Sequence, residues 1–391
     1  MTVTLRHKLR VALVTRYPYV DSDAYSGLVQ VSLRLCDALA RRDDVELVVL
    51  SRAYQPQAIE RRQVGNYQVV FLPYAAQVLR NPTFYFGAAA ALSHELRRLK
   101  PDIVHCQVTP ETAIGSLLSG LPLVSTIHGI YAAEAESASS LRARIAFPII
   151  RAIESWYVRR MRHIMSGTPY VFRFVQARNP HAKLYNISNP IDPAFFAGDV
   201  RANRPDPQSI LQLGTIYPRK GLDLTIEALH QLRRFFPRLR LTVAGNEVDK
   251  EFIGAVRSKI VAYDLAKQVR WLGPISQEQL IGEMRSHQII CLPSREDTLP
   301  MVLSQAMAIG NLCVASDAGG IPDMIAHGRQ GILFPRDNAR ALAQALAVAL
   351  QLSPERSEEI RLANRAYAEQ TYHDDGIAAQ TVAAYRQILA G

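Results

Sequence analysis

The stretch from Cys291 to Gly320, which reads CLPSREDTLPMVLSQAMAIGNLCVASDAGG, constrains the fold of this chain most. It predicts an apolar strand that stops at Pro293, a helix that opens near Pro300 and ends at Gly310, and a second strand over Leu312–Ser316. Proline suits the first helical turn, and glycine suits the left-handed position after the last turn. Two strand-to-helix turns are thus expected at the carboxyl ends of neighbouring parallel strands, where open α/β sheets bind ligands. The free N–H groups at the start of the Pro300 helix favour an anion such as a phosphate.

Strand and helix patterns alternate along the rest of the chain, which predicts parallel sheets with right-handed crossovers. A loop dense in Pro, Asn and Asp over Asn186–Gln208 divides the alternation into two series. Because 391 residues suffice for two full cores, we predict an α/β fold whose two similar halves enclose an interdomain cleft. The first strands are expected at Arg10–Thr15, Val45–Leu50, Tyr67–Leu72, Asp102–His105, Leu123–Ile127, His163–Ser166 and Lys183–Ile187. The second strands are expected at Ile210–Leu213, Leu239–Ala244, Val269–Leu272, Gln288–Leu292, Leu312–Ser316 and Gly331–Leu333, before helices over Ala339–Leu350 and most of Ser357–Ala390.

Composition narrows the class of protein. Lys+Arg 45 against Asp+Glu 35 gives a formal charge of +10, which suits nucleotide phosphates, anionic lipids or nucleic acid without ranking them. The four cysteines include no CxxC pair, so we expect neither a zinc site nor a disulfide framework. This cysteine usage suits a protein of the reducing cytoplasm. No apolar run approaches the roughly 20 residues of a membrane span, and no signal peptide is evident.

Short motifs follow one another along nearly the whole chain. They are KPDIVHCQ (Lys100–Gln107), TIHG (Thr126–Gly129), NPID (Asn189–Asp192), PRKGLDLTIEAL (Pro218–Leu229), VAGN (Val243–Asn246), VRWLG (Val269–Gly273), GGIPDMI (Gly319–Ile325) and HGRQGILF (His327–Phe334). In the order and spacing of these motifs, the chain resembles the retaining nucleotide-sugar glycosyltransferases of the GT-B fold, of the family 4 type. The resemblance implies two Rossmann-like domains with parallel sheets that face each other across a cleft.

The resemblance also implies domain limits and an activity. An acceptor-binding domain is expected over residues 1–190, with a C-terminal helix at about 374–391 packing back on it. A linker at 191–207 and a donor-binding domain over 208–373 are expected to follow. The implied enzyme moves a sugar from a UDP-, GDP- or ADP-sugar to a hydroxyl of a glycan, lipid-linked or small-molecule acceptor, with retention of configuration. No cofactor and no nucleic-acid partner is expected.

Two basic residues are the candidates for the leaving diphosphate. Arg219 and Lys220 stand at a strand-to-helix turn just before Gly221. Sugar transfer from a nucleotide needs the departing diphosphate neutralised, and these side chains offer a guanidinium fork and a compact ammonium. By resemblance, the Lys220 position contacts the diphosphate. The alternative is a solvated basic turn.

The acidic pattern of the family is altered in this chain. Relatives carry two glutamates eight residues apart, one near the donor sugar and one on the ribose hydroxyls, and this chain has Asp297 and Gln305 there. Glu296 is an adjacent carboxylate that offers a substitute for Asp297. A carboxylate accepts hydrogen bonds from two hydroxyls, whereas a Gln amide accepts with one end and donates with the other. Backbone N–H groups around Leu299–Val302 remain available for the donor phosphate, and Thr298, Leu299, Pro300 and Met301 are the donor-binding candidates of this turn. For Gln305 the alternative is a surface helix position.

Other positions are assigned by resemblance. Thr215 replaces an arginine that many relatives aim at the diphosphate, and the donor base is expected near Gly273, within Trp271–Pro274. His128 is expected to face the donor sugar. The remaining candidates are Gly27, at the donor, and Ser26, His105 and Gln107, at the acceptor.

Metal and membrane complete the predictions. No DxD motif stands near a strand end, so catalysis is expected to be metal-independent, with the leaving-group charge met by Arg219, Lys220 and the start of the Pro300 helix. The resemblance implies His128, Arg219, Lys220 and Asp297 as the catalytic residues. Leu141–His163 interleaves apolar residues with arginines at near-helical spacing. Two interpretations are open: a domain helix with its apolar face inward and its arginines in water, or peripheral contact with an anionic membrane. Pro148 would interrupt one continuous helix.

Two other classes of function stay open. Gln305 and Thr215 also suit a catalytically weakened relative that binds a nucleotide or glycan. A different GT-B activity, such as a nucleotide-sugar epimerase or a phosphorylase, is the second alternative, although no motif for a cofactor lysine or dedicated phosphate site is seen.

Overall fold

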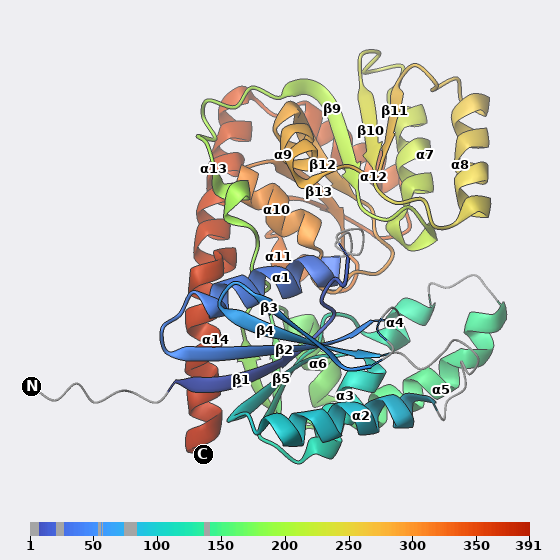
Figure 1. The fold of residues 1–391 in the computed structure, drawn as a ribbon. Helices are drawn as coiled ribbons and strands as arrows, with labels where there is room; N and C mark the ends of the chain where they lie inside the picture. Colours follow the sequence, from blue (N-terminus) through green and yellow to red (C-terminus); the bar gives the residue numbers. More distant parts are fainter. Residues whose placement is uncertain (1–7, 21–26, 54–55, 57, 74–83, 137–140) are drawn as a thin grey trace, which may run out of the picture. The chain divides into compact units, whose positions relative to one another are not determined.

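The computed structural model describes residues 8–20, 27–53, 56, 58–73, 84–136 and 141–391 (Figure 1). The chain divides into two compact units. Unit 1 comprises Met1–Ile130, Pro148–Ile191 and Tyr372–Gly391, and unit 2 comprises Tyr131–Phe147 and Asp192–Thr371. Each unit contains a sheet of parallel strands with helices, so the predicted α/β class with two Rossmann-like domains is confirmed.

Unit 1 is built on an eight-stranded sheet of order β3-β4-β2-β1-β5-β6-β7-β8. All neighbours are parallel except β3 and β4, which are antiparallel. The predicted series missed β3 because its sequence, ERRQV, is charged and lacks an apolar alternation; such residues suit an edge strand. The strands are β1 Leu9–Val14, β2 Val45–Ala53, β3 Glu60–Val64, β4 Tyr67–Pro73, β5 Ile103–Gln107, β6 Leu123–Thr126, β7 His163–Ser166 and β8 Lys183–Asn186.

The end of the chain returns to unit 1. Helix α14, Asp374–Ala390, packs against α1, Gly27–Ala40, and buries Ile377, Val382 and Tyr385 in the core shared by α1 and strands β1 and β2 (Figure 1). Two ion pairs, Arg41–Asp374 and Arg386–Asp44, flank this packing. The other helices of this unit are α2 Phe84–Leu99, α3 Pro110–Ser119 and α6 Pro169–Gln176. Helix α4, Tyr131–Glu136, belongs to unit 2, and α5, Leu141–Val158, is divided between the units at Pro148.

Unit 2 is built on a six-stranded, wholly parallel sheet of order β11-β10-β9-β12-β13-β14. The strands are β9 Asp206–Leu213, β10 Arg240–Ala244, β11 Val269–Gly273, β12 His287–Leu292, β13 Leu312–Ser316 and β14 Gly331–Phe334. The helices are α7 Leu222–Leu232, α8 Lys250–Ala262, α9 Gln277–Ser286, α10 Met301–Ile309, α11 Ile321–Met324, α12 Ala339–Leu350 and α13 Pro354–Tyr372.

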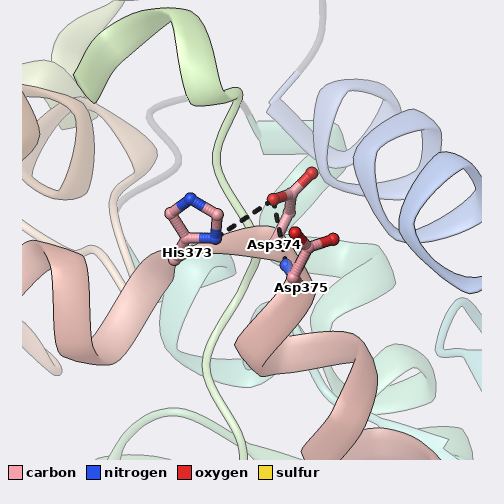
Figure 2. A group of neighbouring side chains, drawn as sticks. All are labelled: His373, Asp374 and Asp375. Atoms are coloured by element: carbon pink, nitrogen blue, oxygen red, sulfur yellow. Dashed lines mark hydrogen bonds and ion pairs between the residues drawn. The ribbon is translucent and has the colours of Figure 1, made fainter. Parts of the chain in front are cut away.

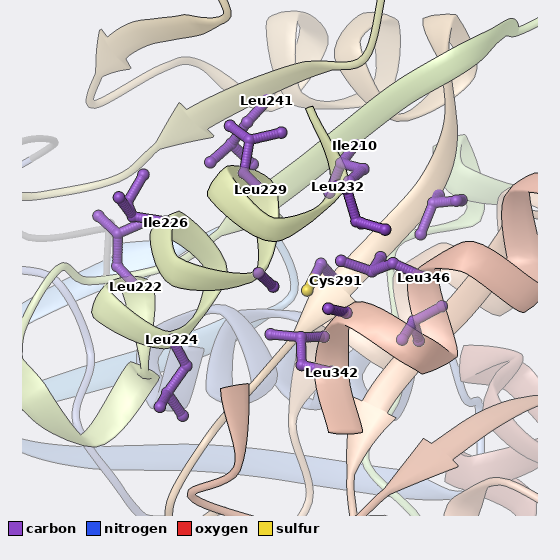
Figure 3. Close-up of a cluster of buried hydrophobic side chains, with 14 of the residues drawn as sticks. Ile210, Leu222, Leu224, Ile226, Leu229, Leu232, Leu241, Cys291, Leu342 and Leu346 are labelled. Carbon is purple, nitrogen blue, oxygen red and sulfur yellow. The ribbon is translucent and has the colours of Figure 1, made fainter. Parts of the chain in front are cut away.

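The largest buried cluster lies on one face of the unit 2 sheet. Leu229 and Leu232 of α7 and Leu346 of α12 pack in one cluster with Ile210 of β9 and Leu241 of β10 (Figure 3). Each of these side chains is at most 5% exposed. Burying a leucine contributes about 1.5–3 kcal/mol. This packing fixes α7, and with it the turn that precedes the helix.

Candidate active site

The strand order of the unit 2 sheet changes direction between β9 and β12. β10 and β11 lie on one side of β9, whereas β13 and β14 lie beyond β12. In open α/β sheets, ligands bind outside the carboxyl ends of the strands at such a switch point. The β9–α7 and β12–α10 connections both leave from these ends, so they form the candidate site.

The β9–α7 connection carries the two predicted cations. Arg219 and Lys220 lie on a 3-10 turn, Pro218–Lys220, and Gly221 ends the turn with φ 66°. A Cβ at Gly221 would stand 2.1 Å from the carbonyl oxygen of Pro293, the residue that follows β12. The two connections therefore touch along their backbones, and this contact leaves no room for a side chain.

Lys220 and Asp297 form an ion pair across the two connections. Lys220 Nζ lies 2.5 Å from Asp297 Oδ2, and the side chains are only 18% and 12% exposed. The hydroxyl of Ser294 donates to the same carboxylate oxygen at 3.2 Å. The residue predicted at the diphosphate and the residue predicted at the donor sugar are thus direct neighbours.

Arg219 also contacts both connections: its own turn, and the loop between β12 and α10 that contains Glu296 and Asp297, here called the acidic loop. Its Nε donates to the Tyr217 hydroxyl at 2.7 Å, and Nη1 donates to the carbonyl oxygen of Glu296 at 3.2 Å. Both cations are therefore fixed by contacts within unit 2 rather than extended into solvent.

Arg295 is a site residue that the sequence did not reveal. Its backbone N–H donates to the Arg219 carbonyl oxygen at 2.7 Å, and its guanidinium donates to both carboxylate oxygens of Asp223 at 3.0 and 2.8 Å. Its Nε donates to Asp337 at 2.8 Å, and the hydrogen bond with Asp223 raises the pKa of Arg295. Arg295 thus braces the β9–α7 turn against the acidic loop. The local sequence SRED (Ser294–Asp297) does not indicate that Arg295 pairs with Asp223 and Asp337, which are distant in the chain.

The acidic loop itself is buried. Glu296, Asp297 and Thr298 are 4%, 8% and 2% exposed. The turn after β13 covers them: Gly320 N–H donates to the Asp297 carbonyl oxygen at 2.8 Å, and a Cβ at Gly319 would stand 2.2 Å from that oxygen. A third strand-to-helix connection therefore closes over this loop.

Helix α10 opens near Pro300, as predicted. Pro300 is its N-cap, with ψ 116°, and Met301 is its first residue; no side chain caps the first turn. Thr298 Oγ1 is buried without a hydrogen-bond partner in the part of the chain described here. A buried polar atom left unpaired costs about 1–3 kcal/mol, so this hydroxyl and the uncapped N–H groups together favour a polar ligand.

The remaining donor candidates occupy the same edge of the sheet. Thr215 follows β9, Gly273 ends β11, and Gln305 lies in the second turn of α10; all three are half-buried. Leu299 and Met301 flank Pro300 and are also half-buried. Their predicted roles at the nucleotide stay predictions.

The unit 1 candidates form a separate polar group at the ends of β5 and β6. His128 is half-buried, and its Nε2 is hydrogen-bonded to Gln107 Oε1. His105 and Gln107 are each 1% exposed, so neither can contact an acceptor directly, and any role they have there passes through His128. Burial lowers the pKa of His128 to about 4 and that of His105 to about 3, which keeps both rings neutral at physiological pH. Gly27 is exposed at the first position of α1, and Ser26 lies outside the described residues.

The described residues include one group of side chains spaced as metal ligands are. His373, Asp374 and Asp375 lie together at the start of α14, with ligand atoms within 4.8 Å of one another (Figure 2). Arg41 Nη2 already donates to Asp374 at 2.6 Å and to Asp375 at 2.8 Å. The amino end of α14 also stabilises these negatively charged carboxylates through the helix dipole. The group therefore has a structural explanation as a helix anchor.

Comparison with protein families assigns each half of the chain. Residues 25–195 match the model described as Glycosyltransferase Family 4, and residues 199–367 match the model described as Glycosyl transferases group 1.

Characterised relatives are distant. Glycogen synthase from Mycobacterium tuberculosis is 27% identical over 259 residues, which cover 64% of this chain and 61% of that protein. Phosphatidyl-myo-inositol mannosyltransferase from the same organism is 24% identical over 393 residues, covering 97% of each chain.

Solved structures share the fold. Sucrose-phosphate synthase from Thermosynechococcus elongatus superposes with a TM-score of 0.82 at 18% identity, covering 98% of this chain and 100% of that chain. HepE from Anabaena in complex with UDP-glucose superposes with a TM-score of 0.71 at 17% identity, covering 97% and 99% of the two chains.

Proposed function

Because the chain is a GT-B glycosyltransferase of the family 4 type, we propose that it moves a sugar from a nucleotide-sugar donor to an acceptor hydroxyl. We further propose that transfer retains the anomeric configuration and needs no metal ion. The observation that carries this proposal is the convergence of Arg219, Lys220 and the uncapped start of α10 at the switch point of the unit 2 sheet.

Each part of that convergence has a task in the proposed reaction. The leaving diphosphate gains negative charge as the sugar bond breaks, and two fixed cations with a helix amino end stabilise that charge. Thr298 Oγ1 supplies a further hydrogen bond to a phosphate oxygen. Asp297, or Glu296 beside it, accepts hydrogen bonds from donor-sugar hydroxyls, and Gln305 contacts the ribose. His128 contacts the donor sugar, as the family resemblance implies.

The donor is proposed to be a UDP-, GDP- or ADP-sugar. The HepE structures, which contain UDP and UDP-glucose, support a nucleotide-sugar as the ligand class. The experiment is a thermal-shift screen with UDP, GDP and ADP and their sugars, in the presence of EDTA and again with Mg²⁺. A nucleotide that binds only the folded protein raises the Tm, by an amount that grows with ligand concentration. Mass spectrometry and NMR of the product then establish transfer and anomeric configuration; no shift with any nucleotide overturns the proposal.

A second function, nucleotide or glycan binding without catalysis, is favoured by two departures from the family pattern. Gln305 replaces a carboxylate, and Thr215 replaces an arginine. Calorimetry that finds nucleotide binding, together with neither sugar transfer nor donor hydrolysis across many acceptors, supports this alternative instead.

The acceptor is proposed to be presented at an anionic membrane surface. On α5, Ile149 and Trp156 are 51% and 36% exposed, and Arg151 is exposed as well. Arg159 and Arg160, which directly follow the helix, are also exposed. The Arg160 guanidinium stacks 4.4 Å from the Trp156 ring centroid, while Tyr157 and Val158 are buried on the opposite side. Apolar residues among arginines suit contact with anionic lipid headgroups. No described helix has both the length and the apolar character that crossing a membrane requires.

A further inference from the structure

A chain of hydrogen bonds runs from the C-terminal helix to His128 within unit 1. Tyr385, on α14, places its hydroxyl 2.6 Å from His105 Nδ1. His105 Nε2 lies 3.2 Å from Gln107 Nε2 and 2.7 Å from Thr126 Oγ1, and Gln107 Oε1 is bonded to His128 Nε2. Tyr385, His105 and Gln107 are each at most 1% exposed, so water does not compete for these bonds.

The proton positions along this chain depend on one another. In the orientation that the structure gives the Gln107 amide, its nitrogen donates to His105 Nε2, and the neutral His105 ring then carries its proton on Nδ1. Nδ1–H then donates to the Tyr385 oxygen. At the other end an amide oxygen only accepts, so His128 must carry a proton on Nε2. The neutral His128 ring is left with Nδ1 as a hydrogen-bond acceptor.

A second arrangement satisfies the same contacts with every proton moved. If His105 carries its proton on Nε2, Gln107 must turn so that its oxygen accepts that proton and its nitrogen donates to His128 Nε2. His128 then carries its proton on Nδ1 and offers a donor instead of an acceptor. In the first arrangement His105 Nδ1–H donates to the Tyr385 oxygen, and in the second the Tyr385 hydroxyl donates to His105 Nδ1. Only the first arrangement therefore needs the Tyr385 oxygen as an acceptor.

We propose that Tyr385 is a positioning residue: by accepting the His105 Nδ1–H it maintains, through His105 and Gln107, the tautomer of His128 that is protonated on Nε2. In this arrangement His128 Nδ1 accepts a hydrogen bond from a hydroxyl of the bound sugar, a role that rests on the proposed function. Without the Tyr385 hydroxyl, a buried Nδ1–H has no acceptor. Because an orphaned buried N–H is rarer and more costly than an under-used acceptor, the chain switches to the second arrangement.

The test is Tyr385→Phe, which removes one oxygen from the chain. Tyr185→Phe is the matched control, because Tyr185 meets His163 Nδ1 at 3.0 Å in the same unit but has no bond to His128. NMR of protein labelled with ¹⁵N-histidine reports the tautomers directly, with His105→Gln and His128→Gln used for assignment. We expect His128 protonated on Nε2 in the wild type and in Tyr185→Phe, and on Nδ1 in Tyr385→Phe.

Activity provides an independent readout. In Tyr385→Phe we expect kcat for transfer to fall by as much as about a hundredfold, while the Kd for the free nucleotide is unchanged, because that ligand is proposed to bind unit 2. An unchanged His128 tautomer in Tyr385→Phe, or Nδ1 protonation in the wild type, overturns the proposal. If the wild type transfers no sugar, the proposed function fails, while the tautomer measurement still decides whether Tyr385 controls His128.

Discussion

Lys220 and Asp297 belong to turns that follow different strands, yet their charged atoms lie 2.5 Å apart. The pair joins the residue assigned to the diphosphate with the residue assigned to the sugar. Removing one partner therefore affects both binding chemistry and folding, and the two effects are separable by experiment.

Lys220→Ala should reduce transfer by about a hundredfold or more, because one fixed charge at the leaving group is lost. It should also lower the free energy of unfolding by about 1–3 kcal/mol, since a nearly buried carboxylate loses its partner. The double variant Lys220→Ala/Asp297→Asn should regain stability but not activity. Lys259→Ala, which breaks the more exposed pair with Glu227, is the control and should cost less than about 1 kcal/mol. Full turnover in Lys220→Ala contradicts the assigned role.

Gly319→Ala should destabilise unit 2 and weaken nucleotide binding together. The new Cβ would meet the Asp297 carbonyl oxygen at 2.2 Å, at a backbone φ of 54°. The expected loss is at least about 1–3 kcal/mol from backbone strain alone. Gly254→Ala, on an exposed face of α8 with no atom within 4 Å of the added Cβ, should instead stabilise by up to about 1 kcal/mol. Urea unfolding of both variants measures the contrast; equal effects would refute the close approach.

Gln305→Glu should tighten donor binding about three- to tenfold. A carboxylate accepts hydrogen bonds from both ribose hydroxyls, whereas an amide accepts with only one end. Calorimetry with the preferred nucleotide and with its 2′-deoxy form checks the result. A gain that is equal for the two forms indicates that the ribose is not the partner.

Acidification should destabilise the protein through His105 and His128. Burial lowers their pKa values to about 3 and about 4, from 6.5. Between about pH 6.5 and 4 the unfolded state binds more protons than the folded state, so stability falls as pH falls through this window. The slope is at most about 1.4 kcal/mol per pH unit for each ring. His128→Gln should flatten the dependence measured by urea unfolding, whereas replacing the exposed His181 should not.

The α5 surface should bind anionic vesicles. Ile149→Ser/Trp156→Ser should reduce sedimentation with phosphatidylglycerol liposomes several-fold, because apolar area leaves the lipid interface. Phe235→Ser removes a 78% exposed aromatic residue from unit 2 and should leave sedimentation unchanged. Binding that is identical for neutral and anionic vesicles, or equal loss in both variants, argues against this surface.

The sequence reveals the layout of the fold because strand and turn signals are local. β7 and β13 lie where their apolar runs predict, and Gly310 ends α10 with φ 83°. The charged edge strand β3 escaped prediction because it is specified by pairing with β4 rather than by its own pattern.

The candidate active site could be predicted only in part, because its contacts join residues that are far apart in the sequence. Arg219 and Lys220 stand out by their place before Gly221, but nothing local indicates that Lys220 pairs with Asp297, 77 residues away. The loss of stability predicted above for Lys220→Ala therefore rests on an ion pair that only the structure reveals. Tyr385 is further still from the residues it contacts, at 280 positions from His105.

The packing of α14 against α1 has a consequence for biosynthesis. The ribosome delivers β1, α1 and β2 first, yet the helix that covers them and supplies Tyr385 emerges only after unit 2 has been translated. Until α14 has been synthesised, the apolar residues of α1, β1 and β2 that it covers stay exposed in the nascent chain. Chaperones can bind this exposed surface during the translation of unit 2.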